Sequence, residues 1–200
     1  MEGSLRIRPL FIAGPWEQGF ALDFHTSSSV YLGDDAFGHP VYDTRRTPLG
    51  DLLYKLKYRE DRSVLPQIAA TLHHFLESKT WKLDAVVPMP PSNPRRRVHT
   101  ALEIAEALGK LSSLPVCGAC IIKVKTTPQL KNVFDRTERE RLLSSAFRAD
   151  ARMAGGKRLL LLDDLYRSGA TAQTAARVLM DDGMAAGLYF IAVTKTRKHA

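Results

Sequence analysis

A chain of 200 residues has room for one ordinary domain, or for one domain with a small additional lobe. Hydrophobic residues make up 44% of it and charged residues 25%, which excludes a mostly disordered protein. The formal net charge of +8 predicts an anionic partner, either a phosphorylated metabolite or a nucleic acid. Apolar runs stay far below the ~20 residues that span a bilayer, and the N-terminus lacks a secretory apolar core. We therefore expect a cytoplasmic protein without a membrane span.

The first part of the chain is rich in turns and aromatic residues. Residues 20–32 have the composition of a strand, residues 33–40 that of a turn, and residues 41–44 that of a second strand, which together predict a β-hairpin. Thr47 and Pro48 are typical of a helix start, and Ser63 is expected to cap a second helix that extends to about residue 76. We therefore place an N-terminal β-hairpin region at residues 1–47 and an α/β domain at residues 48–200.

Strands and helices alternate in the rest of the chain. Apolar runs predict strands at residues 83–87, 116–124, 159–162 and 188–193, and helical spacing predicts helices at residues 98–108 and 169–180. This order predicts an α/β fold with a mostly parallel central sheet flanked by helices and joined by right-handed crossovers. In such sheets, ligands bind beyond the carboxyl ends of the strands.

The two cysteines, Cys117 and Cys120, stand at the start of the strand predicted at residues 116–124. A structural zinc site usually needs four ligands, and neither a second CxxC pair nor a nearby histidine is present. A redox pair normally opens a helix instead of a strand. We expect two small reduced side chains, because a structural disulfide is unfavourable in the cytosol.

The most informative segment runs from Arg158 to Thr171. Four leucines are followed by Asp163 and Asp164, and then by a loop with Ser, Gly and Thr that opens a helix. The carboxylates can accept hydrogen bonds from the vicinal hydroxyls of a sugar, and the helix N-terminus favours a phosphate. The segment therefore predicts a cradle for a ribose 5-phosphate group. The alternative is an ordinary strand–turn–helix connection, which explains one aspartate but not two.

At these residues the sequence resembles the type I phosphoribosyltransferases, whose signature is four apolar residues, two acids and a hydroxyl-rich loop that ends in Gly-x-Thr. The resemblance implies the fold of that family and binding of 5-phosphoribosyl 1-pyrophosphate (PRPP). It places Asp163 and Asp164 on the ribose hydroxyls, and it places the 5′-phosphate in the loop made of Arg167, Ser168, Gly169, Ala170 and Thr171. Arg167 departs from the pattern, because purine-salvage members carry there an aspartate that accepts a proton. This departure weakens the 6-oxopurine salvage interpretation.

Three other stretches resemble the ComF-like branch of that family, which is associated with DNA uptake in competent bacteria. They are Leu49–Tyr58, Asp84–Pro90 and the basic segment Thr126–Phe147. With the signature, the resemblance covers roughly residues 47–195. The cysteine-rich zinc module that is common in that branch is missing, and the hairpin region stands in its place.

The same resemblance extends to two basic segments. It implies a pyrophosphate-binding role for the loop after residue 88, through Ser92, Arg95 and Arg96; the alternative is a solvated basic turn. It also implies a mobile loop that closes over the reactants and contains Lys123, Lys125, Arg136 and Arg139. The alternatives for that stretch are a charged surface helix or a nucleic-acid surface.

The implied reaction is the displacement of pyrophosphate from C1 of PRPP by a nitrogenous acceptor, which would make the protein a glycosyltransferase. Mg²⁺ is the expected cofactor, held mainly by phosphate oxygens and not by a site that the protein makes alone. We assign no catalytic residue, because no general base is evident. The alternatives are a non-catalytic PRPP- or nucleotide-binding module and a DNA-processing accessory protein with single-stranded DNA as its partner. A homodimer is expected by analogy.

Overall fold

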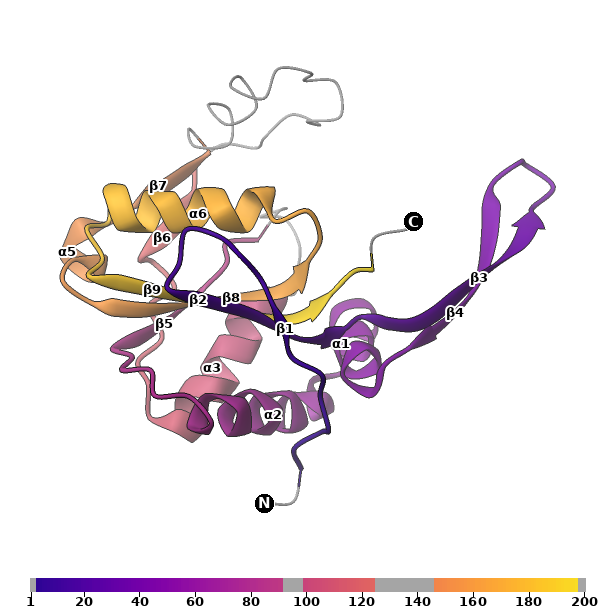
Figure 1. Ribbon diagram of the computed structural model, residues 1–200, viewed down its shortest axis with the longest axis horizontal. Helices are drawn as coiled ribbons and strands as arrows, with labels where there is room; N and C mark the ends of the chain where they lie inside the picture. Colours follow the sequence, from indigo (N-terminus) through magenta and orange to yellow (C-terminus); the bar gives the residue numbers. More distant parts are fainter. Residues whose placement is uncertain (1–2, 92–98, 125–145, 198–200) are drawn as a thin grey trace.

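The computed structural model describes residues 3–91, 99–124 and 146–197. Its central sheet has five strands in the order β1-β2-β9-β8-β5 (Figure 1). The strands β2 (Gln18–Phe24), β9 (Gly187–Lys195), β8 (Arg158–Tyr166) and β5 (Ala85–Pro88) are parallel, and β1 (Leu10–Phe11) is antiparallel to β2. The predicted mostly parallel α/β sheet is therefore confirmed.

Helices cover both faces of this sheet (Figure 1). The helices α1 (Pro48–Arg59), α2 (Leu65–Glu77) and α3 (Thr100–Ser112) lie on one face, and α6 (Ala170–Asp181) and the short α5 (Ala151–Ala154) lie on the other. The leucines of β8 alternate between the two resulting cores: Leu160 and Leu162 pack with the α1–α3 side, and Leu159 and Leu161 with the α6 side. A strand buried on both faces needs such a continuous apolar run.

The two helix starts in the first third of the chain differ. Thr47 caps α1 as predicted, and its Oγ1 accepts a hydrogen bond of 3.0 Å from the Gly50 N–H. Ser63 is not the cap of the second helix. Asp61 instead accepts from the Ser63 N–H and caps the 3₁₀ turn η1 (Arg62–Val64), after which α2 begins without a side-chain cap.

The strand predicted at residues 20–32 is two strands. The first, β2, belongs to the central sheet, and the chain then continues through His25 into β3 (Thr26–Asp34), which pairs with β4 (Pro40–Arg46) as a hairpin. This hairpin projects from the body of the molecule (Figure 1). The domain boundary at residue 47 stays a prediction; β1 and β2, which precede it, share the central sheet with the strands that follow it.

The strand predicted at residues 116–124 is also divided. Val116 makes a single parallel bridge to Val86, and after a turn β6 (Ile121–Lys123) pairs with β7 (Phe147–Ala149) in a separate sheet. The turn brings the Cα atoms of Cys117 and Cys120 to 5.4 Å, and the two cysteines form a disulfide. The expectation of two reduced cysteines was wrong: it rested on the expected cytosolic environment, and the predicted strand did not include the turn that brings the two residues together.

Among the helices of residues 3–91, 99–124 and 146–197, none is long and apolar enough to cross a membrane.

Candidate functional site

A cavity of about 580 Å³ lies at the carboxyl ends of β5 and β8. Its polar lining includes side chains from two separate parts of the chain, namely Lys57, Asp163, Asp164, Arg167, Ser168 and Thr171. Its apolar wall comes from β5–β7 and includes Met89, Ile121 and Phe147. The cavity therefore sits where parallel α/β sheets bind ligands, and the predicted sugar-phosphate segment forms part of its wall.

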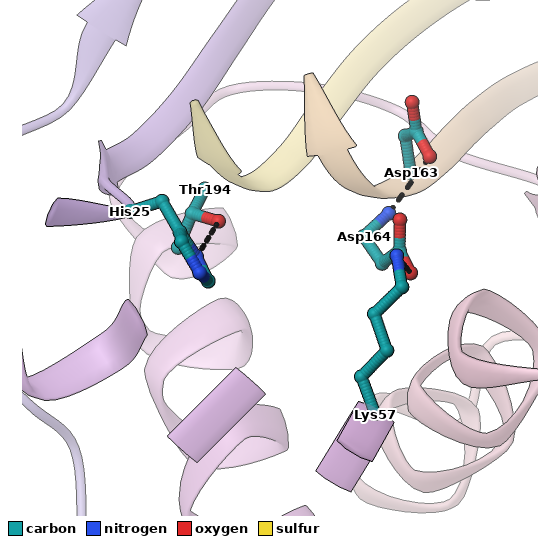
Figure 2. Close-up of polar contacts among 5 residues, drawn as sticks. All are labelled: His25, Lys57, Asp163, Asp164 and Thr194. Atoms are coloured by element: carbon teal, nitrogen blue, oxygen red, sulfur yellow. Dashed lines mark hydrogen bonds and ion pairs between the residues drawn. The ribbon is translucent and has the colours of Figure 1, made fainter. Parts of the chain in front are cut away.

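The two aspartates are adjacent residues of β8 (Figure 2). The Oδ1 atom of Asp163 accepts a hydrogen bond of 2.9 Å from the N–H of Asp164. Burial, and next the neighbouring charge of Asp164, raises the pKa of Asp163 to about 7. Near neutral pH the Asp163 carboxyl is therefore divided between a form that only accepts hydrogen bonds and a form that also donates one.

Lys57 of α1 completes this carboxylate pair from outside the motif. Its Nζ lies 2.7 Å from Oδ2 of Asp164, and both side chains are largely buried, with exposed fractions of 17% and 16% (Figure 2). Leu49, Leu53 and Leu56 fix the buried face of α1, and Lys57 follows at the margin of that face. Lys57 was not predicted as a site residue, although the ComF-like stretch Leu49–Tyr58 contains it. Helical spacing shows which face of a helix is buried, but not which other segment that helix contacts.

The loop after β8 leads directly into the N-terminus of α6. Gly169 has a φ of 83°, and a Cβ at this position would collide with the Tyr166 Oη. No side chain caps α6, so the N–H groups of its first turn keep their capacity to bind an anion. Of the predicted phosphate-binding residues, Arg167, Ser168, Gly169 and Thr171 line the cavity, whereas Ala170 does not.

A second polar pair lies near the first and was not predicted. The Nδ1 atom of His25 is 3.1 Å from Oγ1 of Thr194, at the end of β9 (Figure 2). Burial lowers the pKa of His25, and the charges of Arg46 and Lys57 lower it further, so the imidazole is neutral at pH 7. His25 is not part of the cavity lining.

Comparisons with known proteins point to one fold and one relative. No family model matches the chain. Over 146 residues it is 31% identical to the competence protein ComFC of Bacillus subtilis (strain 168), a match that covers 69% of this chain and 56% of that relative. In a solved structure, the PRPP amidotransferase from B. subtilis matches 80% of this chain and 34% of its own chain, at 14% identity and a TM-score of 0.51.

The chain is a ComF-like protein with the type I phosphoribosyltransferase fold. The adenine phosphoribosyltransferase from Leishmania tarentolae also matches, at 10% identity and a TM-score of 0.49 over 94% of both chains. This ComF-like chain spans just over half the length of the curated relative that it matches.

The remaining predicted residues of the ComF-like chain fall into two groups. Lys123 lines the cavity, and burial lowers the pKa of its ammonium group. The other predicted pyrophosphate-binding and mobile-loop residues lie outside the described part of the chain; they are Ser92, Arg95, Arg96, Lys125, Arg136 and Arg139.

The side chains that the structure brings together limit how the expected magnesium ion could be bound. Within the described residues, no group of three or more His, Cys, Asp or Glu side chains could hold a metal. Asp163 and Asp164 suit Mg²⁺ when substrate phosphates supply the other ligands, because Mg²⁺ is commonly bound through one or two carboxylates.

Proposed function

We propose that this ComF-like chain binds PRPP in the cavity at the end of β8 and transfers the phosphoribosyl group to a nitrogenous acceptor, releasing pyrophosphate. One juxtaposition carries the proposal. A carboxylate pair, Asp163 and Asp164, lines the same cavity as the loop that opens the uncapped N-terminus of α6. A cavity lined by both groups suits a ligand with a vicinal diol at one end and a phosphate at the other. The similarity to ComFC and the fold are consistent with it.

In this proposal, the chain's own residues act by binding and positioning. The carboxylates of Asp163 and Asp164 receive the ribose hydroxyls, and the loop from Arg167 to Thr171 surrounds the 5′-phosphate. Ser92, Arg95 and Arg96 are proposed to bind the pyrophosphate. Asp163 and Asp164 would hold Mg²⁺ together with substrate phosphates, and the ion would stabilise the negative charge of the leaving group.

The apolar wall of the cavity supports a planar acceptor. Met89, Ile121 and Phe147 form a surface on which an aromatic base can pack. Among the described residues that line the cavity, only Asp163 and Asp164 carry a carboxylate. Arg167 stands at the position of the purine-salvage base and carries a fixed positive charge. We therefore propose an acceptor that does not need an aspartate to take its proton.

The first test is calorimetric titration of the full chain with PRPP and Mg²⁺. We expect the double variant Asp163→Asn/Asp164→Asn to lose binding by a hundredfold or more, since each lost charge-assisted hydrogen bond costs about 1.5–3 kcal/mol. The matched control is Asp181→Asn/Asp182→Asn, which removes two adjacent exposed carboxylates at the end of α6. Wild-type protein that shows no heat with PRPP would contradict the proposal.

A pyrophosphate-release assay with a panel of bases then separates transfer from binding alone. Release with one base class, abolished in the Asp163/Asp164 double variant, identifies the acceptor. Tight PRPP binding without release for any base would favour the non-catalytic alternative, in which the same cavity acts as a sensor.

Single-stranded DNA is the second candidate ligand. The net charge of +8 and the similarity to a competence protein favour it. It predicts affinity for a labelled oligonucleotide that falls steeply with salt and does not change in the Asp163→Asn/Asp164→Asn variant. Fluorescence anisotropy over a salt series measures both. Affinity that disappears in the double variant would assign the effect to the sugar-phosphate cavity instead.

A further inference from the structure

The hairpin of β3 and β4, residues 26–46, forms an arm that extends away from the body (Figure 1). Its base is anchored by three contacts. Thr47 Oγ1 donates to the Phe24 carbonyl at 2.7 Å, Arg197 Nε donates to the Thr26 carbonyl at 2.9 Å, and the Arg46 guanidinium lies 3.6 Å from the centre of the Tyr54 ring. These contacts fix the direction in which the arm points.

The middle and tip of the arm are unusually apolar for an exposed ribbon. Tyr31 and Tyr42 pair across the strands with ring centres 5.6 Å apart, yet 54% and 47% of their surfaces are exposed. The other large exposed apolar side chains of the arm are Val30, Leu32, Phe37 and Val41. An isolated two-stranded hairpin is marginally stable in water, and clustered exposed apolar residues mark interaction surfaces.

Charge is divided along the arm. The outer part, residues 33–40, carries the carboxylates of Asp34 and Asp35 and no lysine or arginine, although the whole chain is strongly basic. Asp43 pairs with Val30, on the base side of the Tyr31–Tyr42 pair. At the base of the arm Arg45 is exposed, and Arg59 and Arg197 lie exposed on the elements beside it. The arm therefore has an acidic outer part, an apolar middle and a basic base.

We propose that the arm binds the arm of a second copy of this chain, the two arms lying antiparallel across a two-fold axis. In this arrangement the acidic outer part of each arm lies on the basic base of the other, and the apolar middles cover each other. A two-fold interface requires such a self-complementary surface, because every contact occurs twice. The acidic outer part would repel the phosphates of a nucleic acid, so charge favours a second copy over DNA as the occupant.

The proposal predicts how charge-reversal variants of the arm associate. An arm with a purely structural role would not produce this pattern. Arg45→Glu places acid against acid, and Asp34→Lys places base against base, so each variant alone should dissociate about tenfold or more readily than the wild type. When the two variants are mixed, each acidic part again meets a basic part. The mixture should form a heterodimer, and one chain that carries both changes should form a homodimer again.

Sedimentation velocity across the micromolar range measures these states, and circular dichroism confirms that each variant is folded. The matched controls are Arg177→Glu on α6 and Glu106→Lys on α3, which make the same charge changes at exposed positions outside the arm. These controls should associate as the wild type does. A monomeric wild type, a dimer that neither arm variant weakens, or the absence of a heterodimer in the mixture would overturn the proposal.

Discussion

At the scale of single residues, the central observation is that one cation and two carboxylates share a largely buried space. The ammonium group of Lys57 pairs with the carboxylate of Asp164. The carboxyl of Asp163 is instead buried, and it accepts a hydrogen bond from the backbone N–H of Asp164. Identical side chains, adjacent in sequence, therefore have different chemistry. Burial is the largest cause of the raised pKa of Asp163, whereas the counter-ion of Asp164 comes from α1, more than a hundred residues away in sequence.

Lys57→Met should destabilise the protein. The change leaves Asp164 in a largely buried position without its counter-ion, and we expect a loss of about 1–3 kcal/mol in the free energy of unfolding, less than for a fully buried pair. Urea unfolding at pH 7 measures it. The control Lys55→Met, which removes the exposed partner of Asp51, should cost no more than about 0.5 kcal/mol. Equal losses in the two variants would contradict the role given to Lys57.

The raised pKa of Asp163 predicts how stability changes with pH. The folded protein holds this proton up to about pH 7, whereas the unfolded chain releases it near its ordinary value of 3.8. The folded state therefore binds more protons between these pH values, and this residue's contribution to stability falls as the pH rises through the window. Asp163→Asn should remove that fall.

The amide introduced by Asp163→Asn can still accept a hydrogen bond from the Asp164 N–H, so the variant should unfold at a higher urea concentration than the wild type at pH 8. The expected gain is on the order of a few kcal/mol. At pH 4 the two proteins should be close. If the difference in stability between the wild type and the variant is the same at pH 4 and at pH 8, Asp163 does not hold the proton.

At the scale of elements, the connection between β8 and α6 determines the shape of the cavity. Gly169 combines a positive φ with close contact to Tyr166, and both conditions exclude a side chain. The same turn leaves the first N–H groups of α6 uncapped, so a single connection supplies both the tight bend and the anion-binding capacity.

Gly169→Ala should therefore lower stability by more than the strain of a positive φ alone, which is about 1–2 kcal/mol. Gly38→Ala is the matched control, because Gly38 has a φ of 76° and open space around it. Thermal unfolding of both variants tests the difference. In addition, only Gly169→Ala should weaken PRPP binding. If both variants lose the same stability and keep the same affinity, the close contact with Tyr166 has no energetic role.

At the scale of the whole molecule, the body and the arm make different contributions to stability. The buried apolar residues of both cores lie in the central sheet, the helices that cover it, the β6–β7 pair and the adjoining turns, and none of those described belongs to residues 26–46. The arm should therefore be dispensable for folding but necessary for association.

Replacement of residues 30–43 by an Asn-Gly turn tests this division. The melting temperature of the monomeric body should stay within a few degrees of the wild type, because no buried apolar contact is removed. Differential scanning calorimetry at low protein concentration measures it. A large drop would show that the arm stabilises the body.

Much of this protein follows from local sequence. Four leucines before Asp163 define a doubly buried strand, Thr47-Pro48 defines the start of α1, and the turn residues around Gly38 define a hairpin, because each pattern acts through neighbours a few residues apart. The carboxylate–glycine motif likewise carries its own indication of a sugar-phosphate site. The resemblance to a family supplied the remaining expectations.

Only the tertiary structure decided the rest. Residues 20–32 divide at His25 because β2 finds a partner in β9, and the CxxC segment turns and closes a disulfide beside the cavity. Lys57 meets Asp164, and exposed apolar residues gather on a projecting arm, through packing between segments distant in sequence. Periodicity and turn chemistry report the conformation of one segment. Which segments meet depends on how the apolar faces of all of them are buried together.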